Sequence, residues 1–407
     1  MSIKPLAGVK VLDFSKVLAG PLCSQGLADL GAEVIKVEDC SRGDDTRGWP
    51  PFRDGDGAVF VYANRRKRSL ALNLKTPEAQ AIIRKLVKTA DIVMESYGPD
   101  VPEKLHIDHD SLKAVKPDLI YCSVSGFGRT GPLSHGKGYD MILQAFTGMV
   151  SIMGEPDSGP VRAPYSPVDQ GTGMHALSAI LAALLHKRNT GEGCRIDVSL
   201  FDTGVAFLGY MMQSYWEKGA EPKRFGCAHE SLCPYQNFMA ADKPILIGVA
   251  SEPLWQRFCA AVGHPEMASD PRFRTNADRV RNRDVVIAAV QAIIGQRSSE
   301  EWVEKLTGEG IPCTQINTFK EVLTHPHTLA SGLILDYESP NYGKLQSIGQ
   351  PVKFNGQRAD AGSAAPRHAQ HTEEILRELG MDDDAITALE KAGAISRTGK
   401  DSEQRQS

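Results

Sequence analysis

The chain has 407 residues, of which 41% are hydrophobic and 24% charged, and its formal net charge is -4. This length predicts two or three domains with a sizeable core, and the lack of a basic excess or a groove-reading motif argues against a nucleic-acid partner. The eight cysteines show no CxxC or Cys/His metal spacing, so we expect reduced thiols, no metal and a cytoplasmic protein without a membrane segment.

The first two hundred residues alternate between strand-like and helix-like segments. The pattern predicts strands at 9–14, 33–38, 91–94, 119–124 and 195–199, and helices at 21–30, 77–90, 139–153 and 169–186. This order is typical of an α/β fold with a parallel sheet covered by helices. Since no GxGxxG follows the first strand, a dinucleotide site is not favoured.

The second half of the chain divides at a stretch rich in Gly, Cys, His, Ser and Pro at 224–234. We expect a large Rossmann-like domain over 1–200 and a helical linker over 201–226, which includes a helix at 203–218. A small α+β domain follows over 227–325, with a strand at 245–249 and helices at 253–262, 284–294 and 299–307. A return segment over 326–395 completes the large domain, and the polar residues 396–407 are predicted to be disordered.

Asp169 is the first candidate for chemistry, because it stands directly before a helix that is apolar almost all round. One interpretation is an N-cap, whose side chain accepts a hydrogen bond from the first turn. The other is a nucleophile, because the helix dipole and the free N–H groups would keep the carboxylate ionised at neutral pH. The two interpretations are compatible, and Gly171 and Gly173 would let a bulky substrate approach.

The second candidate is a basic run, Asn64-Arg65-Arg66-Lys67-Arg68. Such a run is either a solvated connecting loop or a clamp for phosphate groups. Further on, Gly126–Gly131 follows a predicted strand, in the place where open α/β sheets bind ligands.

Several ordered segments together resemble class III CoA-transferases over about residues 6–395. They are LAGVKVLDF (6–14), VLAGP (17–21), LGAEVIKVE (30–38), GDDTR (43–47), NRRKRSLALNLK (64–75), YCSVSGFG (121–128), GYD (138–140) and Val168-Asp169. The closest likeness is to the branch that uses succinyl-CoA and short dicarboxylates. The resemblance implies a ring-shaped chain that forms an interlocked homodimer, with the large domain binding CoA.

The resemblance also implies the site. Asp169 would attack an acyl-CoA thioester, forming an aspartyl anhydride and then an aspartyl-CoA thioester, from which a free carboxylic acid receives CoA. Acyl-CoA thioesters are thus substrates, and no permanently bound cofactor is expected. Residues 226–231 would be the loop that covers the site. The implied CoA contacts are Val17, Ala19, Leu72, Lys75, Tyr97, Lys104, Lys137 and Tyr139.

Three alternatives remain at this point. An acyl-CoA racemase of the same family would need a histidine base where this chain has Tyr139. A thioester hydrolase would result if water reached the anhydride. A non-catalytic CoA-binding protein is a third alternative, against which the presence of Asp169 argues.

Overall fold

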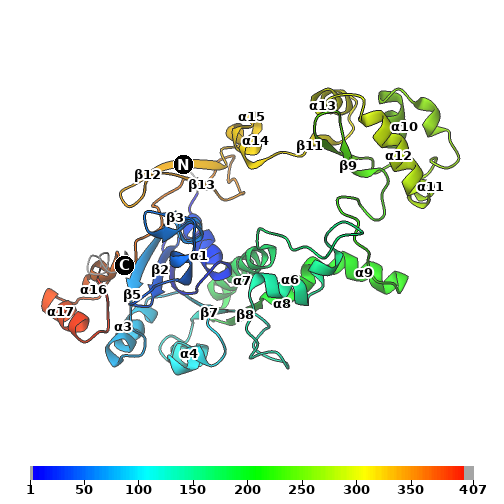
Figure 1. Ribbon diagram of the computed structural model, residues 1–407. Helices are drawn as coiled ribbons and strands as arrows, with labels where there is room; N and C mark the ends of the chain where they lie inside the picture. Colours follow the sequence, from blue (N-terminus) through cyan, green and yellow to red (C-terminus); the bar gives the residue numbers. More distant parts are fainter. Residues whose placement is uncertain (1–2, 398–407) are drawn as a thin grey trace. The chain divides into compact units, whose positions relative to one another are not determined.

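A computed structural model describes residues 3–397 and divides into two compact units (Figure 1). The first unit contains the chain up to Met149, Ala163–Met212 and the part from Pro326 onward. The second contains Val150–Arg162 and Gln213–His325. Of the predicted disordered residues 396–407, those from 398 onward lie outside the described part of the chain.

A six-stranded parallel sheet forms the centre of the first unit. Its strand order is β5-β2-β1-β6-β7-β8. The strands are β1 (Lys10–Phe14), β2 (Glu33–Glu38), β5 (Lys67–Ala71), β6 (Ile92–Glu95), β7 (Ile120–Ser125) and β8 (Arg195–Ser199). The order runs outward from β1 in one direction and from β6 in the other, so the topological switch point lies between β1 and β6.

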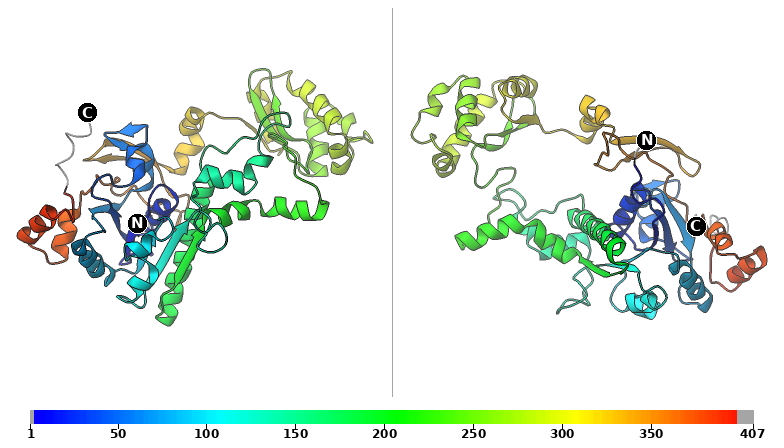
Figure 2. Two further views of the ribbon diagram at one scale, coloured as in Figure 1. Left: turned by 60° about the horizontal axis from the view of Figure 1, so that its bottom comes forward. Right: turned by 180° about the vertical axis from the view of Figure 1, so that it is seen from behind.

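Both faces of this sheet are covered by helices. On one face, alternate strand residues such as Leu12, Phe14 and Ile35 join a core with α3 (Pro77–Val87) and α16 (Thr372–Glu378). On the other face lies α1 (Ala19–Asp29), which packs against α7 (Pro167–Thr190) (Figure 2). The packing is tight, because a Cβ added at Gly173 of α7 would lie 2.6 Å from the carbonyl oxygen of Ala19.

The remaining elements of the first unit include two further helices that bear on the site, α6 and α8. The elements are β3 (Phe52–Arg53), β4 (Asp56–Gly57), α2 (Ala58–Ala63), α4 (Val101–Lys104), α5 (His109–Lys113), α6 (Asp140–Phe146), α8 (Leu200–Phe207), α15 (Pro326–Ser331), β12 (Ile334–Ser339), β13 (Gly343–Ile348) and α17 (Asp383–Lys391), with a 3-10 turn at Asp45–Gly48. A further 3-10 turn, Met149–Ile152, lies where the chain passes from the first unit to the second. The helix α9 (Gly209–Lys218) follows α8, so the single helix predicted at 203–218 is two helices.

The second unit has its own small antiparallel sheet, in the order β11-β10-β9. Buried aromatic residues, among them Trp255 and Trp302, form its core between the sheet and the helices. The elements are β9 (Tyr235–Met239), β10 (Pro244–Gly248), α10 (Glu252–Ala261), α11 (Asn276–Arg281), α12 (Arg283–Ile294), α13 (Ser299–Gly308), β11 (Cys313–Gln315) and α14 (Phe319–Thr324), with a 3-10 turn at Pro265–Ala268.

Candidate active site

A cavity of about 380 Å³ lies at the carboxyl ends of β1, β6 and β7, at the switch point of the sheet. Its walls come from residues 16–19 after β1, 96–99 after β6 and 124–129 at the end of β7. The segment 136–139 and Asp169 also line it, together with Asp45, Ser134 and Leu200. Crevices at this place in parallel sheets are the usual ligand sites of such folds.

Asp169 reaches this cavity from the first turn of α7. The helix begins at Pro167, so Asp169 is its third residue, and the prediction that Asp169 caps the helix is wrong. The cap position belongs to Ser166, which has a φ of 54° and makes no side-chain cap hydrogen bond. Pro167 explains the earlier start, because proline is favoured in the first turn of a helix.

The N-terminal end of α7 is instead capped by Asp140, the first residue of α6. Its Oδ2 accepts hydrogen bonds from the backbone N–H groups of Val168, at 2.8 Å, and Asp169, at 3.0 Å. Because Asp140 is buried and Gln144 donates to its other oxygen, the carboxylate is held in place. The N–H groups of α7 that could hold an oxyanion are thereby occupied.

Burial, and after it the negative charge of Asp140, raise the pKa of Asp169 from 3.8 to about 7. This differs from the sequence-based expectation that the helix terminus keeps the carboxylate ionised at neutral pH. The main reason is that burial disfavours the charged form, and in addition Asp140 occupies the N–H groups whose partial positive charge would have favoured it. Asp169 is therefore a carboxylate of unusually high basicity.

A partly buried ion pair joins two walls of the cavity. Arg129 lies 2.7 Å from Glu95, the last residue of β6, and also donates to Ser123 on β7 and to the carbonyl of Tyr97. Glu95 in turn accepts a hydrogen bond from the Tyr97 N–H. The glycine-rich turn at 126–131, which the sequence marks only weakly, thus carries the arginine that anchors the neighbouring wall.

The eight residues implied as CoA contacts fall into two groups. Val17, Ala19, Tyr97, Lys137 and Tyr139 line the same cavity as Asp169. The other three do not line it, although they also follow carboxyl ends of the sheet: Leu72 is buried just after β5, Lys75 is exposed three residues later, and Lys104 is exposed at the end of α4.

The basic run Asn64–Arg68 is not a phosphate clamp. Arg65 and Lys67 are buried, and they form ion pairs with Asp29 at 3.0 Å and Asp13 at 3.1 Å. The other two arginines of the run are also ion-paired. The physical reason is that part of the run is strand β5, missed in the sequence, whose alternate side chains point into the interior.

Sequence reasoning also missed the partners that hold the site, chiefly Asp140, Glu95 and Lys36. A signal was present for Lys36, because a lysine inside the apolar strand EVIKVE needs a buried partner. No such signal marks Asp140, because it caps α7 only when α6 and α7 pack against each other in the folded chain. Among the described residues, no group of His, Cys, Asp and Glu is arranged to hold a metal, and no helix there is long and apolar enough to cross a bilayer.

Comparisons with known proteins identify the family of the chain. Residues 6–372 match the model of CoA-transferase family III. The mouse succinyl-CoA:glutarate CoA-transferase is 37% identical, over 97% of this chain and 91% of its own. The succinate–glutarate CoA-transferase of Agrobacterium fabrum is also 37% identical, over 92% of this chain and 96% of its own.

A solved structure gives the same result for the fold. The CAIB/BAIF family protein from Brucella suis is 35% identical, with a TM-score of 0.82, and the match covers 93% of this chain and all of that one. These matches extend over nearly the whole chain, including the parts that build the cavity. The chain therefore belongs to CoA-transferase family III and is an enzyme that transfers CoA from an acyl-CoA thioester to a free carboxylic acid.

Proposed function

We propose that Asp169 is the nucleophile of this CoA transfer and that it carries first the acyl group and then CoA. Its carboxylate would attack the thioester carbonyl, break the C–S bond and release the CoA thiolate, leaving an aspartyl anhydride. The thiolate would then attack the Asp169 carbonyl and release the acyl group as a carboxylate. The acceptor carboxylate would run these two steps in reverse. The observation that carries the proposal is the placement of Asp169 in the cavity at the switch point.

The raised pKa of Asp169 supports this role. An ordinary carboxylate, with a pKa of about 4, is a poor group to displace a thiolate, whose conjugate acid has a pKa of about 8.5. At about 7, the pKa of Asp169 lies much closer to that of the thiol, so anhydride formation becomes less unfavourable. Contacts with remote parts of CoA can offset the rest of the cost.

A source of oxyanion stabilisation other than α7 is needed, because Asp140 occupies its first N–H groups. We propose that the N-terminus of α1 supplies it. This helix has no side-chain cap at Leu18, and Leu18 and the first helical residue, Ala19, line the cavity with Asp169. Backbone N–H groups in this position stabilise the charge that develops on a tetrahedral intermediate.

For the substrates, we propose succinyl-CoA as donor and a short dicarboxylic acid as acceptor. The relatives from mouse and Agrobacterium fabrum carry succinyl or succinate and glutarate in their names, and a relative from Haloarcula marismortui, 34% identical, is a succinyl-CoA:mesaconate CoA-transferase. We propose the eight implied contacts as the CoA site, with Val17, Ala19, Tyr97, Lys137 and Tyr139 at its reacting end.

We further propose that the enzyme is a homodimer of interlocked, ring-shaped chains. Apolar side chains on α6 and α7 support a partner, because the single chain leaves Met174 60% and Leu185 59% exposed, along with Phe146. The sequence predicted α7 to be buried almost all round, and a second copy would complete that burial. Light scattering at micromolar concentration should give twice the chain mass; a monomer would contradict the proposal.

The experiment that tests the proposed function is a mass-spectrometric screen for CoA exchange between succinyl-CoA and a panel of mono- and dicarboxylic acids. We expect a new acyl-CoA with dicarboxylic acids and at least a thousandfold lower rate in Asp169→Asn, which matches the wild type in shape. Hydroxylamine added during turnover should modify the peptide that contains Asp169. Full activity of Asp169→Asn, or modification at another residue, would refute the role of Asp169.

A further inference from the structure

The turn that connects β1 to α1 has an unusual backbone. Val17 has a φ of 70°, in the left-handed region that β-branched residues strongly disfavour. The residue lines the cavity with Asp169, and the helix that follows it packs against α7 one turn beyond Asp169. The conformation of this turn therefore sets the distance between the cavity wall and the proposed nucleophile.

Three side chains distant in sequence, from strand β2, the segment after β6 and the segment before the 3-10 turn at Asp45–Gly48, hold consecutive backbone groups of this turn. Lys36 donates to the carbonyl of Ser15 at 2.8 Å. Ser96 accepts the N–H of the next residue, also at 2.8 Å, and Asp44 accepts the N–H of Val17 at 3.3 Å. A strained conformation persists only when its surroundings hold it on several sides, and these contacts meet that condition.

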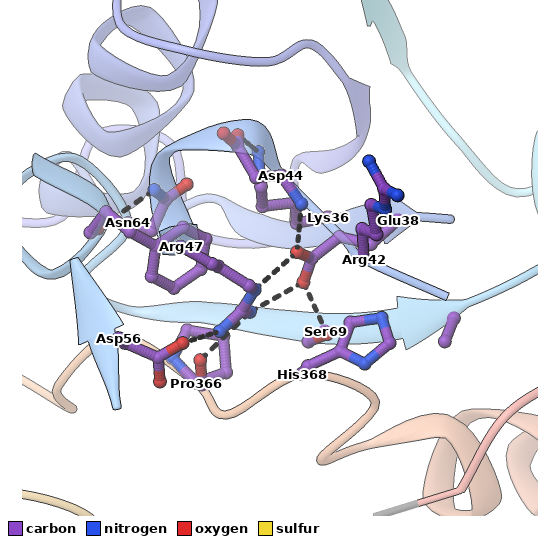
Figure 3. A network of polar contacts seen from close by, with 12 residues as sticks. Lys36, Glu38, Arg42, Asp44, Arg47, Asp56, Asn64, Ser69, Pro366 and His368 are labelled. Atoms are coloured by element: carbon purple, nitrogen blue, oxygen red, sulfur yellow. Dashed lines mark hydrogen bonds and ion pairs between the residues drawn. The ribbon is translucent and has the colours of Figure 1, made fainter. Parts of the chain in front are cut away.

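Lys36 and Asp44 are joined to each other by an ion pair of 2.9 Å, and both are almost completely buried (Figure 3). The position of Asp44 is fixed further, because Glu38 accepts its N–H at 3.0 Å and Thr46 donates to its Oδ1. Glu38 is itself held by Arg47, at 2.7 Å (Figure 3). The pair is thus a rigid support that reaches from the middle of the sheet to the cavity wall.

We propose that Lys36 and Asp44 are positioning residues, which hold the Val17 turn in its left-handed conformation so that the wall formed by Val17 and Ala19 presents the thioester to Asp169. This inference rests on the proposed function. Neither residue lines the cavity at the reacting end, so both act through the backbone of the turn. Their loss would let the turn relax, and a small misplacement of reacting groups lowers the chemical rate strongly while remote binding contacts persist.

The test is a rescue experiment on the whole enzyme. Asp44→Asn should lower kcat at least tenfold per folded protein and change the KM for acyl-CoA less than threefold. Adding Val17→Gly should restore kcat at least threefold, because glycine adopts a positive φ without strain. If Lys36 and Asp44 only stabilised the fold, Val17→Gly would not restore kcat. To separate the two cases, rates are divided by the amount of folded protein, which circular dichroism measures.

Asp29→Asn is the matched control, because it breaks another buried ion pair of the same unit, with Arg65. It should lower the melting temperature but leave kcat within twofold, and Val17→Gly should not raise its kcat. Should Asp44→Asn fail to fold, the double variant Lys36→Met/Asp44→Leu replaces the pair by apolar side chains, which buried ion pairs often tolerate. It should fold, have low kcat, and be rescued by Val17→Gly.

Three outcomes would overturn the inference: normal kcat in both pair variants, no rescue by Val17→Gly, or equal rescue in the Asp29→Asn background. Asp169→Asn separates this inference from the proposed function. If Asp169→Asn is inactive while the pair variants are normal, only the positioning role fails. If Asp169→Asn keeps full activity, the proposed function fails.

Discussion

The charge of Asp140 should tune the basicity of Asp169, and this can be measured through Asp140→Asn. The pKa of Asp169 is raised by about 3 units, from 3.8 to about 7, with burial as the larger cause and Asp140 as the smaller. The share of Asp140 is therefore below half, at most about 1.5 units, or about 2 kcal/mol. Because the charged neighbour disfavours the ionised form, its removal must lower the pKa of Asp169.

The assay is the pH dependence of kcat/KM for acyl-CoA. Its acid limb, the fall in kcat/KM at low pH, reports the pKa of the essential carboxylate in the free enzyme. The wild type should lose activity as the pH falls through about 7, where Asp169 becomes protonated. In Asp140→Asn this limb should move to lower pH, by no more than about 1.5 pH units, and the plateau rate should fall because the carboxylate is less basic. The asparagine oxygen can still accept the N–H groups of Val168 and Asp169, so the turn itself should persist.

Gln144→Met is the matched control, because it removes the hydrogen bond to Asp140 while leaving the charge in place. It should lower the melting temperature and leave the acid limb where the wild type has it. A wild-type limb below pH 5 would refute the raised pKa of Asp169. A limb that stays near pH 7 in Asp140→Asn would refute the assignment of part of the shift to Asp140.

Three further predictions follow from the site. Asp169→Asn should raise the free energy of unfolding by up to about 4 kcal/mol at pH 8 but not at pH 4. The reason is that the pKa of Asp169 is higher in the folded than in the unfolded chain, so the wild type loses stability as the pH rises from 4 to 8. Urea titrations measure the difference, and an equal difference at both pH values would contradict this prediction. Arg66→Ala and Arg68→Ala should lower the melting temperature and leave the KM for acyl-CoA within twofold. Lys137→Ala should instead raise that KM about tenfold, on the order of one lost charge-assisted hydrogen bond. Steady-state kinetics measures both effects. Gly173→Ala should lower the free energy of unfolding by about 1–3 kcal/mol and reduce kcat, because the added Cβ would clash with the backbone of α1. An unchanged melting temperature would contradict this prediction, because it would mean that α1 and α7 can move apart at no cost in stability.

The sequence determined much of the first unit because local signals and tertiary structure agree there. The strands at 33–38 and 195–199 have the predicted bounds, and the helix at Pro77 begins where its proline and the preceding threonine cap indicate. The family was also evident from ordered short segments. The strand β5 was missed because Lys67 and Arg68 hide the apolar alternation, and their ion partners are distant in sequence.

What only the tertiary structure decided is the electrostatics around Asp169. The sequence places Asp169 near a helix terminus, and from this alone an ionised carboxylate follows. In the folded chain, burial of Asp169 and, after it, the charge of Asp140 raise the pKa instead, and the Asp140 carboxylate, 29 residues earlier, occupies those N–H groups. Likewise, no local pattern joins Lys36 and Asp44 to Val17. Such effects depend on distances between side chains from different elements, and these are set only when the helices and strands pack together.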